Sequence, residues 1–195
     1  MNKGLSTLPK STLDTLMLLF NQGRYLEIIN ITTDLIIKFP RCFKLFNIIG
    51  AAHKGMGNLV DAELSFRKAC ELEPLNSDAH NNLGFVLAER GSYEQAICSY
   101  KRVLKILPND FESHVTLGNL LLQKKRYDEA IKSYDNALKI NPNSGMVYNN
   151  MGNAFSEKGD LDQALSSYNN AIRCSKKFAG AYNNIGNILK EKLKY

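Results

Sequence analysis

The sequence predicts an all-α array in which one pair of helices is repeated along the chain. Four prolines lie 34 residues apart, at Pro40, Pro74, Pro108 and Pro142. A fixed period of this length is typical of a supersecondary unit that is copied and stacked, so that neighbouring copies close a common core. Aligned with proline at position 32, the repeats span 9–42, 43–76, 77–110, 111–144 and 145–178, followed by a terminal helix at 179–195. We therefore expect a single array over residues 1–195.

The same alignment places small and aromatic residues at fixed positions of the repeat. Position 8 carries glycine, position 20 alanine and position 24 an aromatic ring: Gly50, Gly84, Gly118, Gly152 and Gly186; Ala62, Ala96, Ala130 and Ala164; Phe66, Tyr100, Tyr134 and Tyr168. Small residues let two helices cross closely, and a ring can fill the space beside the crossing. A single helix pair cannot bury both of its apolar stripes, which favours stacking of the repeats.

Each repeat is predicted to hold two helices joined by a short turn. In repeat 77–110, apolar residues recur at helical spacing on both sides of Gly91. Gly91 suits the left-handed backbone just past a helix end, as do Gly57 and Gly159. Pro108 ends the second helix because it lacks an N–H and clashes with the preceding turn. First helices are expected at 10–22, 43–56, 77–90, 111–124, 145–158 and 179–193, and second helices at 25–38, 59–72, 93–106, 127–140 and 161–174.

The pattern of small residues at positions 8 and 20, a ring at 24 and proline at 32 resembles the tetratricopeptide repeat (TPR) family. The resemblance covers nearly the whole chain and implies a right-handed α-solenoid of helix-turn-helix units. Two repeats depart from the pattern. The first has Leu16 and Ile28 where small residues belong and Thr32 at the aromatic position, and the fifth has Lys176 in place of proline.

Composition favours an intracellular chain, and we expect a cytoplasmic location. The apolar stretch from Leu16 to Phe20 is too short for a membrane span or a signal-peptide core. The four cysteines are scattered over the repeat and match neither a disulfide framework nor a zinc site. The formal charge of +6 is explained by basic residues on the outward-facing second helices, so we expect no nucleic-acid and no membrane partner.

No arrangement of residues in the sequence indicates catalysis or metal binding. His53 lies at position 11, an apolar packing position, and His80 and His114 lie at position 4, which is otherwise aromatic. We expect all three rings to fill space between paired helices. No nucleophile stands out beside a base. We therefore predict that the chain is not an enzyme and uses no metal or cofactor.

Asparagine recurs on the first helices, at positions that face the inner wall of the groove in the TPR family. Ten asparagines occupy three positions: Asn47, Asn81, Asn149 and Asn183 at position 5; Asn82, Asn150 and Asn184 at position 6; Asn119, Asn153 and Asn187 at position 9. Asparagine is a poor helix former, so this ladder needs an explanation. Its side-chain amide matches a peptide amide, which predicts binding of an extended polypeptide through its backbone. The alternative, that some of these side chains cap or bridge neighbouring helices, stays open, above all at position 5.

The ladder is similar to the TPR arm of protein O-linked N-acetylglucosamine (O-GlcNAc) transferases, in which inner-wall asparagines hold the substrate backbone. The residues that match are Asn82, Asn150 and Asn184. The catalytic domain of that family is absent from these 195 residues, so the resemblance implies binding and not transfer. Chaperone-binding TPR domains carry lysine or arginine at positions 5 and 6, and no repeat here does. We predict no binding of chaperone tails.

Charge on the expected inner wall is uneven. Lys10, Lys44 and Lys54 against Asp14 give the first two repeats +2. The later repeats sum to −4, from Asp78, Glu89, Glu112, Glu157 and Glu191 against Lys190. We predict a ligand with basic residues toward the C-terminal half, with Asp78 and Glu112 among the residues that contact it.

The terminal helix at 179–193 keeps an apolar stripe, with Tyr182, Ile185 and Leu189 at positions that should pack on a second helix. Either the chain is part of a longer protein, or it pairs at this end, most simply with a second copy of itself. Three functions follow. The first is a protein-interaction scaffold that binds an extended peptide, and the alternatives are the substrate-binding arm of a larger glycosyltransferase and an assembly module that self-associates through its ends.

Overall fold

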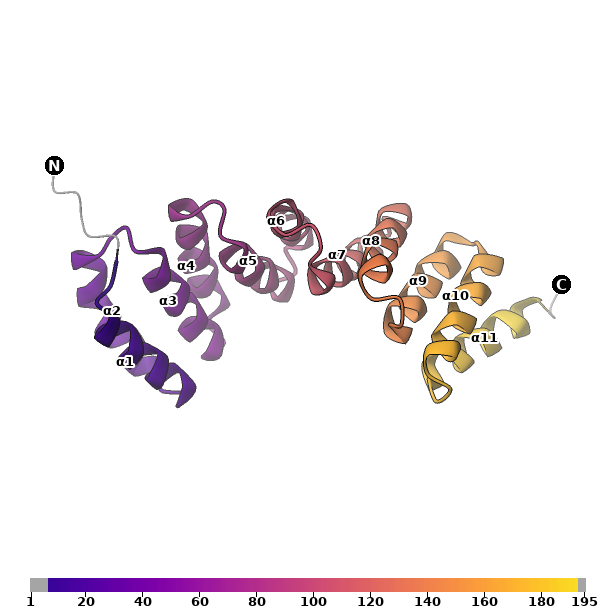
Figure 1. Ribbon diagram of the computed structural model, residues 1–195, viewed down its shortest axis with the longest axis horizontal. Helices are drawn as coiled ribbons and strands as arrows, with labels where there is room; N and C mark the ends of the chain where they lie inside the picture. The colour runs from indigo at the N-terminus through magenta and orange to yellow at the C-terminus, as the bar shows by residue number, and fades with distance from the viewer. Residues whose placement is uncertain (1–6, 193–195) are drawn as a thin grey trace. The chain divides into compact units, whose positions relative to one another are not determined.

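The computed structural model describes residues 7–192, which fold into eleven α-helices without a strand (Figure 1). The first helices are α1 (Lys10–Asn21), α3 (Phe43–Gly55), α5 (Ser77–Glu89), α7 (Phe111–Gln123), α9 (Gly145–Lys158) and α11 (Ala179–Lys192). The second helices are α2 (Tyr25–Lys38), α4 (Leu59–Leu72), α6 (Tyr93–Ile106), α8 (Tyr127–Ile140) and α10 (Leu161–Cys174). All five second helices begin and end at the predicted residues. The predicted residues 193–195, residues 1–6 and the side chain of Glu191 lie outside the described part.

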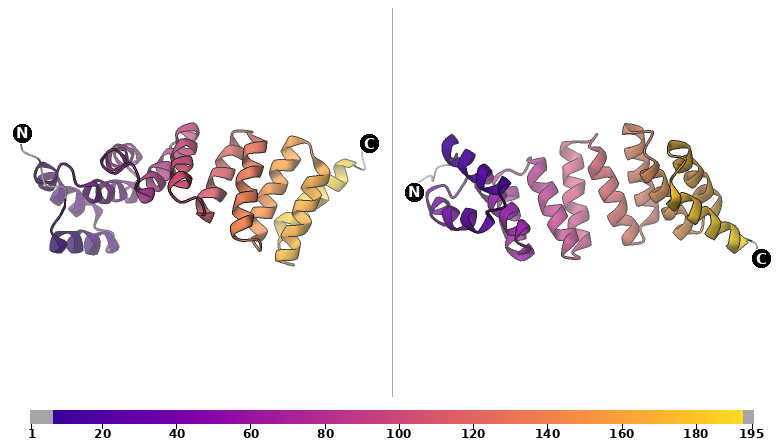
Figure 2. Two further views of the ribbon diagram at one scale, coloured as in Figure 1. Left: turned by 45° about the horizontal axis from the view of Figure 1, so that its top comes forward. Right: turned by 90° about the horizontal axis from the view of Figure 1, so that it is seen from below.

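The chain divides between Ile106 and Leu107 into two compact units. The N-terminal unit contains α1 to α6 and the C-terminal unit contains α7 to α11. Within each unit successive helices pack side by side (Figure 2). The first helix α3 also contacts α5, and α7 contacts α9. The predicted fold class, an all-α solenoid of repeated helix pairs, is confirmed within each unit. A single array over residues 1–195 stays a prediction.

The second to fifth pairs cross at the glycine of position 8, as predicted. A Cβ added to Gly118 or to Gly152 would lie 2.5 Å from Cε1 of Tyr134 or of Tyr168, so each ring packs directly on the glycine backbone. Gly84 has the same relation to Tyr100 at 2.9 Å. The first pair lacks this crossing and instead buries larger side chains, including Leu16, Ile28 and Thr32.

The turn between paired helices requires a left-handed residue in every repeat. Gly57, Gly91 and Gly159 have φ values of 78°, 75° and 91°, which confirms the prediction for these turns, and Gly23 matches them at 71°. In the fourth repeat Lys125 takes the same conformation at φ 56°. A side chain in this region costs about 1–2 kcal/mol, so this turn is the most strained of the series.

The histidines at position 4 do more than fill space between helices. Nε2 of His80 lies 2.9 Å from the carbonyl oxygen of Pro74, and Nε2 of His114 lies 2.9 Å from that of Pro108. Each ring therefore ties its helix to the proline turn that precedes it.

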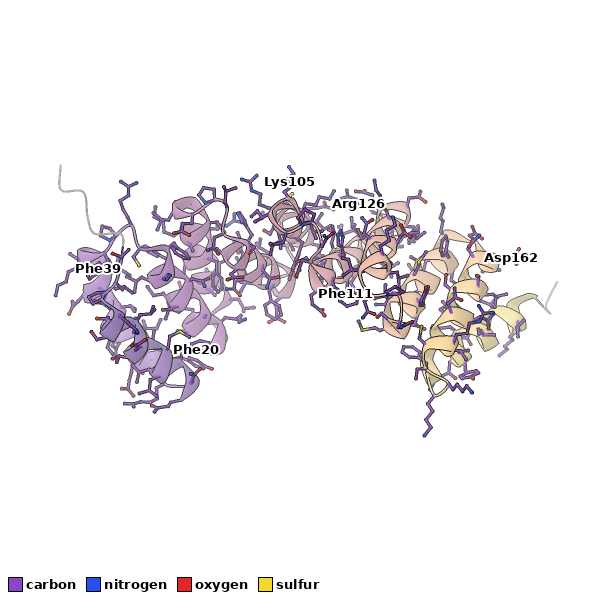
Figure 3. The ribbon with its side chains drawn as sticks, in the orientation of Figure 1. Phe20, Phe39, Lys105, Phe111, Arg126 and Asp162 are labelled. Carbon is purple, nitrogen blue, oxygen red and sulfur yellow. The ribbon has the colours of Figure 1, made fainter. Side chains whose placement is uncertain are left out.

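Basic and acidic residues cover the outer face of the second helices. Lys105 on α6 and Asp162 on α10 are exposed and extend away from the ribbon in Figure 3. Within residues 7–192, no helix combines the length and the apolar character needed to cross a membrane.

Candidate functional site

Asparagine side chains of neighbouring first helices hydrogen-bond to one another in the C-terminal unit. Nδ2 of Asn150 on α9 donates to Oδ1 of Asn119 on α7 at 3.0 Å. Nδ2 of Asn184 on α11 donates to Oδ1 of Asn153 on α9 at 3.0 Å, and also to Oδ1 of Asn149 at 3.1 Å. The amide at position 6 is thus fixed by the repeat before it. We call the surface formed by positions 5, 6 and 9 the asparagine face.

Two tyrosine hydroxyls support the asparagine face from beneath. Tyr134 on α8 donates to Oδ1 of Asn119 at 2.8 Å, and Tyr168 on α10 donates to Oδ1 of Asn153 at 2.8 Å. Burial raises the pKa of both hydroxyls above the usual value, so both remain protonated donors at neutral pH. The oxygen at position 9 is therefore held by two donors, one from its own repeat and one from the next.

This network fixes which atom of each amide is free. Asn119 and Asn153 use their oxygens, and among the described residues nothing accepts a hydrogen bond from their Nδ2 groups. Asn150 and Asn184 use their nitrogens, and no described donor reaches their oxygens. Each pair of adjacent repeats therefore offers at least one free N–H donor and one free carbonyl acceptor. A peptide unit carries the same two groups.

A small cavity opens on this face between α9 and α11. Its volume is about 230 Å³, and its polar lining comprises Asn153, Ser156, Glu157, Tyr168, Asn184 and Asn187. Glu157 is exposed and forms no ion pair with a described residue, while the neighbouring Lys158 is paired with Asp128. The cavity therefore combines a free carboxylate with fixed amides.

The asparagine face of the N-terminal unit is built differently. Nδ2 of Asn82 on α5 donates to Oδ1 of Asn47 on α3 at 3.0 Å, but position 9 holds Ala51 and Phe85. Nζ of Lys54 lies 4.6 Å from the centre of the Phe85 ring, a cation–π contact. This wall presents an aromatic ring and a lysine where the C-terminal unit presents amides.

The structure brings together six of the predicted peptide-binding residues in the C-terminal unit: Asn119, Asn149, Asn150, Asn153, Asn184 and Asn187. Asn82 joins Asn47 in the other unit, and Asn81 is exposed without a side-chain hydrogen bond to a described residue. Asp78 and Glu112 lie in the first turns of α5 and α7, where the helix dipole favours a carboxylate.

Three residues that complete the site were not predicted: Tyr134, Tyr168 and Ser156. One sequence signal could have found the tyrosines. Asn119 precedes Tyr134 by fifteen residues and Asn153 precedes Tyr168 by fifteen, which in this repeat joins position 9 to position 24.

A larger cavity, of about 490 Å³, lies in the N-terminal unit among residues of α4, α5 and α6, including Arg67, Leu83, Leu87 and Arg102. None of the predicted peptide-binding residues lines it, so its size alone does not make it the candidate site.

Several solved structures share the fold. A MamA protein is 21% identical with a TM-score of 0.79, and the match covers 86% of this chain and 91% of that one. YrrB, described as a TPR protein with an unusual peptide-binding site, is 19% identical with a TM-score of 0.80, covering 87% and 88%. PilF of Pseudomonas aeruginosa is 22% identical with a TM-score of 0.64, covering 78% and 70%. Identities this low support the fold alone. No curated protein matches the chain.

Family models agree with the repeat seen in the helices. A model described as TPR repeat matches residues 86–125, 118–159 and 152–192, and one described as tetratricopeptide repeat matches 65–97. These matches cover more than half of the chain, and their span coincides with the glycine crossings of α5 to α10. The chain belongs to the tetratricopeptide repeat family.

Proposed function

We propose that this chain is a protein-interaction module that holds an extended polypeptide on its asparagine face. The observation that carries the proposal is the fixed orientation of the amides. Asn119 and Asn153 offer donors and Asn150 and Asn184 offer acceptors, in the alternation that a peptide backbone requires. The peptide-binding site named for YrrB, a neighbour by fold, supports the same use of a TPR surface.

The affinity should be modest. Each hydrogen bond to the backbone adds about 0.5–1.5 kcal/mol net, so the four free groups together contribute a few kcal/mol. Ordering the peptide opposes much of this gain. From these four groups alone we expect dissociation constants of roughly a millimolar or weaker, and contacts along further repeats would add to this affinity.

We further propose that the ligand is basic where it lies against the C-terminal unit. Glu112 and Glu157 are exposed on first helices of this unit, and neither forms an ion pair with a described residue. Attraction between exposed charges is screened by salt. Binding of a basic peptide should therefore weaken as salt is raised, and binding that is insensitive to salt would contradict this part of the proposal.

A random peptide library, screened against parent and variant proteins, tests the backbone-binding proposal. We expect the double variant Asn150→Ala/Asn184→Ala to lose most of the peptides that the parent retains. The matched control is Asn30→Ala/Asn169→Ala, two exposed asparagines on the second helices α2 and α10. The control should bind like the parent. Equal binding by all three proteins, with unchanged helix content, would place the site elsewhere.

A second candidate function, self-association through α11, is favoured by one observation. In the second to fifth pairs a ring covers the position-8 glycine, but a Cβ added to Gly186 would meet no described atom within 4 Å. One turn away on the same face, Tyr182 is 51% exposed. We propose that a two-fold axis near residue 184 places each Tyr182 ring over Gly186 of a second copy, because a two-fold interface pairs such positions reciprocally.

Sedimentation equilibrium distinguishes this assembly from a monomer. Tyr182→Lys should abolish the concentration-dependent dimer by burying a charge in the interface. Leu64→Lys on α4, which replaces a side chain that is 62% exposed, is the matched control and should leave the dimer intact. A parent chain that remains monomeric at high concentration would overturn this candidate. The third possibility, the substrate-binding arm of a larger glycosyltransferase, stays a prediction.

A further inference from the structure

We infer that the cavity between α9 and α11 binds one cationic side chain, a guanidinium or an ammonium group, of the polypeptide. The inference rests on the proposed peptide-binding function and adds a rule of selectivity to it. Hydrogen bonds to the peptide backbone do not discriminate between side chains, whereas this cavity would select for arginine or lysine at one position of the bound segment.

The lining of the cavity offers several hydrogen-bond acceptors beside the Nδ2 groups of Asn153 and Asn187, which are free among the described residues. Nδ2 of Asn184 donates to both Asn149 and Asn153, which leaves its oxygen as the free polar atom. The hydroxyl proton of Tyr168 is already given to Asn153. Glu157 adds a carboxylate at the rim. A ligand group with several N–H donors and a positive charge matches this lining, and arginine and lysine are the side chains that supply it.

Among the described residues, no lysine or arginine forms an ion pair with the Glu157 carboxylate. Lys158, the next residue, is paired with Asp128 on α8, and Lys190 on α11 forms no ion pair with Glu157. Burial raises the pKa of the Tyr168 hydroxyl, a hydrogen bond with Ser156 opposes this rise, and the negative charge of Glu157 adds a smaller upward shift. The charge of Glu157 therefore acts within the cavity.

The volume of the cavity and its apolar lining also fit a single long side chain. The volume of about 230 Å³ is below the roughly 300–1,000 Å³ of pockets that hold drug-sized ligands. Ile188, which is buried, and the ring of Tyr168 supply apolar surface beside the polar rim. Arginine and lysine pack their methylene stems on such surface while the charged head reaches the acceptors.

The N-terminal unit already contains a cation at the equivalent place. Lys54 at position 12 of the second repeat reaches Phe85 at position 9 of the third. In the C-terminal unit the same two positions are Ser156 and Asn187, which both line the cavity. The short serine leaves open the space that a lysine of the chain occupies in the other unit. We therefore expect the cation to come from the ligand.

The cavity is tested with small probes that do not depend on peptide binding. The probes are Nα-acetyl-arginine N-methylamide and its lysine and citrulline counterparts, titrated at millimolar concentration and followed by the NMR signals of the Asn153, Asn184 and Asn187 side-chain amides. We expect shifts with the arginine and lysine probes and at least about tenfold weaker binding of citrulline, which has the shape of arginine without its charge. Equal shifts with citrulline would overturn the inference.

Two variants locate the effect. Glu157→Gln should weaken the arginine probe about tenfold. Asp34→Asn, which removes one exposed carboxylate on α2, is the matched control and should change nothing. Ser156→Lys should block the cavity by supplying the cation from the chain itself. Undiminished binding of the arginine probe to both Glu157→Gln and Ser156→Lys would also overturn the inference.

Peptides with a central arginine or citrulline in a random background separate this inference from the proposed function. If both kinds bind equally and both depend on Asn150 and Asn184, the backbone function stands and the cation site fails. If no peptide binds but the arginine probe does, the cation site stands and the proposed function fails. A preference for arginine that disappears in Glu157→Gln supports both.

Discussion

The two units fold the same repeat but connect their first helices differently. In the C-terminal unit, position 9 holds asparagine, and Asn119 and Asn153 each bond a tyrosine below and an asparagine beside them. In the N-terminal unit position 9 holds Ala51 and Phe85, one amide pair remains, and Lys54 stacks on Phe85. One position of the repeat therefore decides whether the inner surface presents amides or an apolar ring.

In the C-terminal unit, tyrosine at position 24 occurs together with asparagine at position 9. A buried hydroxyl needs a hydrogen-bond partner, and the ring at position 24 lies below position 9. In the N-terminal unit Phe66 lies below Ala51 and Tyr100 below Phe85, so position 9 supplies no acceptor there. Tyr134 and Tyr168 each find an asparagine instead. The asparagine at position 9 thus has a structural role, as the acceptor for a tyrosine hydroxyl, in addition to the role in binding that we propose.

The largest effect is expected at the helix crossings, which both units share. Gly50→Ala and Gly118→Ala push a methyl group against Phe66 and Tyr134, and we expect each to lower the free energy of unfolding by about 1–3 kcal/mol. Gly118→Ala should be the more damaging, because its Cβ lies closer to the ring and the hydroxyl of Tyr134 is held by Asn119. Urea denaturation measures the difference.

Gly186 on α11, over which no described ring packs, is the control for these crossings. Gly186→Ala should not destabilise, because its Cβ meets no described atom within 4 Å and alanine favours a helix over glycine by about 1 kcal/mol. A loss as large as that of Gly118→Ala would mean that the ring contact does not explain the crossing.

A smaller effect should separate the tyrosines of the two units. Tyr134→Phe removes the bond to Asn119, and we expect a loss of about 0.5–1.5 kcal/mol in thermal or urea unfolding. Tyr100→Phe should change the free energy of unfolding by less, because position 9 of its repeat is Phe85 and offers no acceptor. Equal losses would remove the distinction between the two inner surfaces.

Converting one unit toward the other provides a gain-of-function test. Phe85→Asn places an asparagine above Tyr100, in the relation that Asn119 has to Tyr134. One additional backbone contact is worth about 0.5–1.5 kcal/mol, so we expect peptides to bind about two- to tenfold more tightly. Isothermal titration calorimetry with peptides selected on the parent gives the comparison, and Phe85→Ala is the control that removes the ring without adding an amide.

The smallest expected effect is chemical and confined to the N-terminal unit. Burial raises the pKa of the Cys70 thiol on α4 to about 11, with Arg67 lowering it and Glu71 raising it to lesser extents. The thiolate is the reactive form, so alkylation of Cys70 should be slow near neutral pH and keep accelerating up to about pH 11. Mass spectrometry of peptides alkylated at a series of pH values tests this, and a plateau near pH 9 would contradict it.

Much of the fold follows from the 34-residue period. The prolines and the glycine column predicted the ends of the second helices and the crossing of Gly118 with Tyr134, because both depend on local backbone chemistry and on packing between neighbours in sequence. The division between Ile106 and Leu107 was not predicted, since no change in composition accompanies it. The bonds from His80 and His114 to proline carbonyls were also missed, because their partners are backbone atoms.

The residues of the candidate site were predicted from the sequence, but the hydrogen bonds that connect them were not. The repeat identified Asn150 and Asn184 as members of a ladder. A sequence shows neither which end of an amide is already bonded nor that Lys54 occupies a place which Ser156 leaves open. These properties arise from contacts between side chains about thirty residues apart in the sequence. They decide whether an amide is a donor, an acceptor or a bridge.

The double anchoring of the position-9 oxygens has a consequence for the speed and entropy of binding. A free asparagine samples several rotamers, and a ligand that captures it must restrict that freedom at a cost of about 0.5–1.5 kcal/mol for each immobilised side chain. Asn119 and Asn153 have already lost this freedom during folding, through bonds to a tyrosine and to the next repeat. A peptide that binds to the C-terminal unit therefore meets side-chain amides that are already ordered. Association there should be limited by the ordering of the peptide and not by that of the protein.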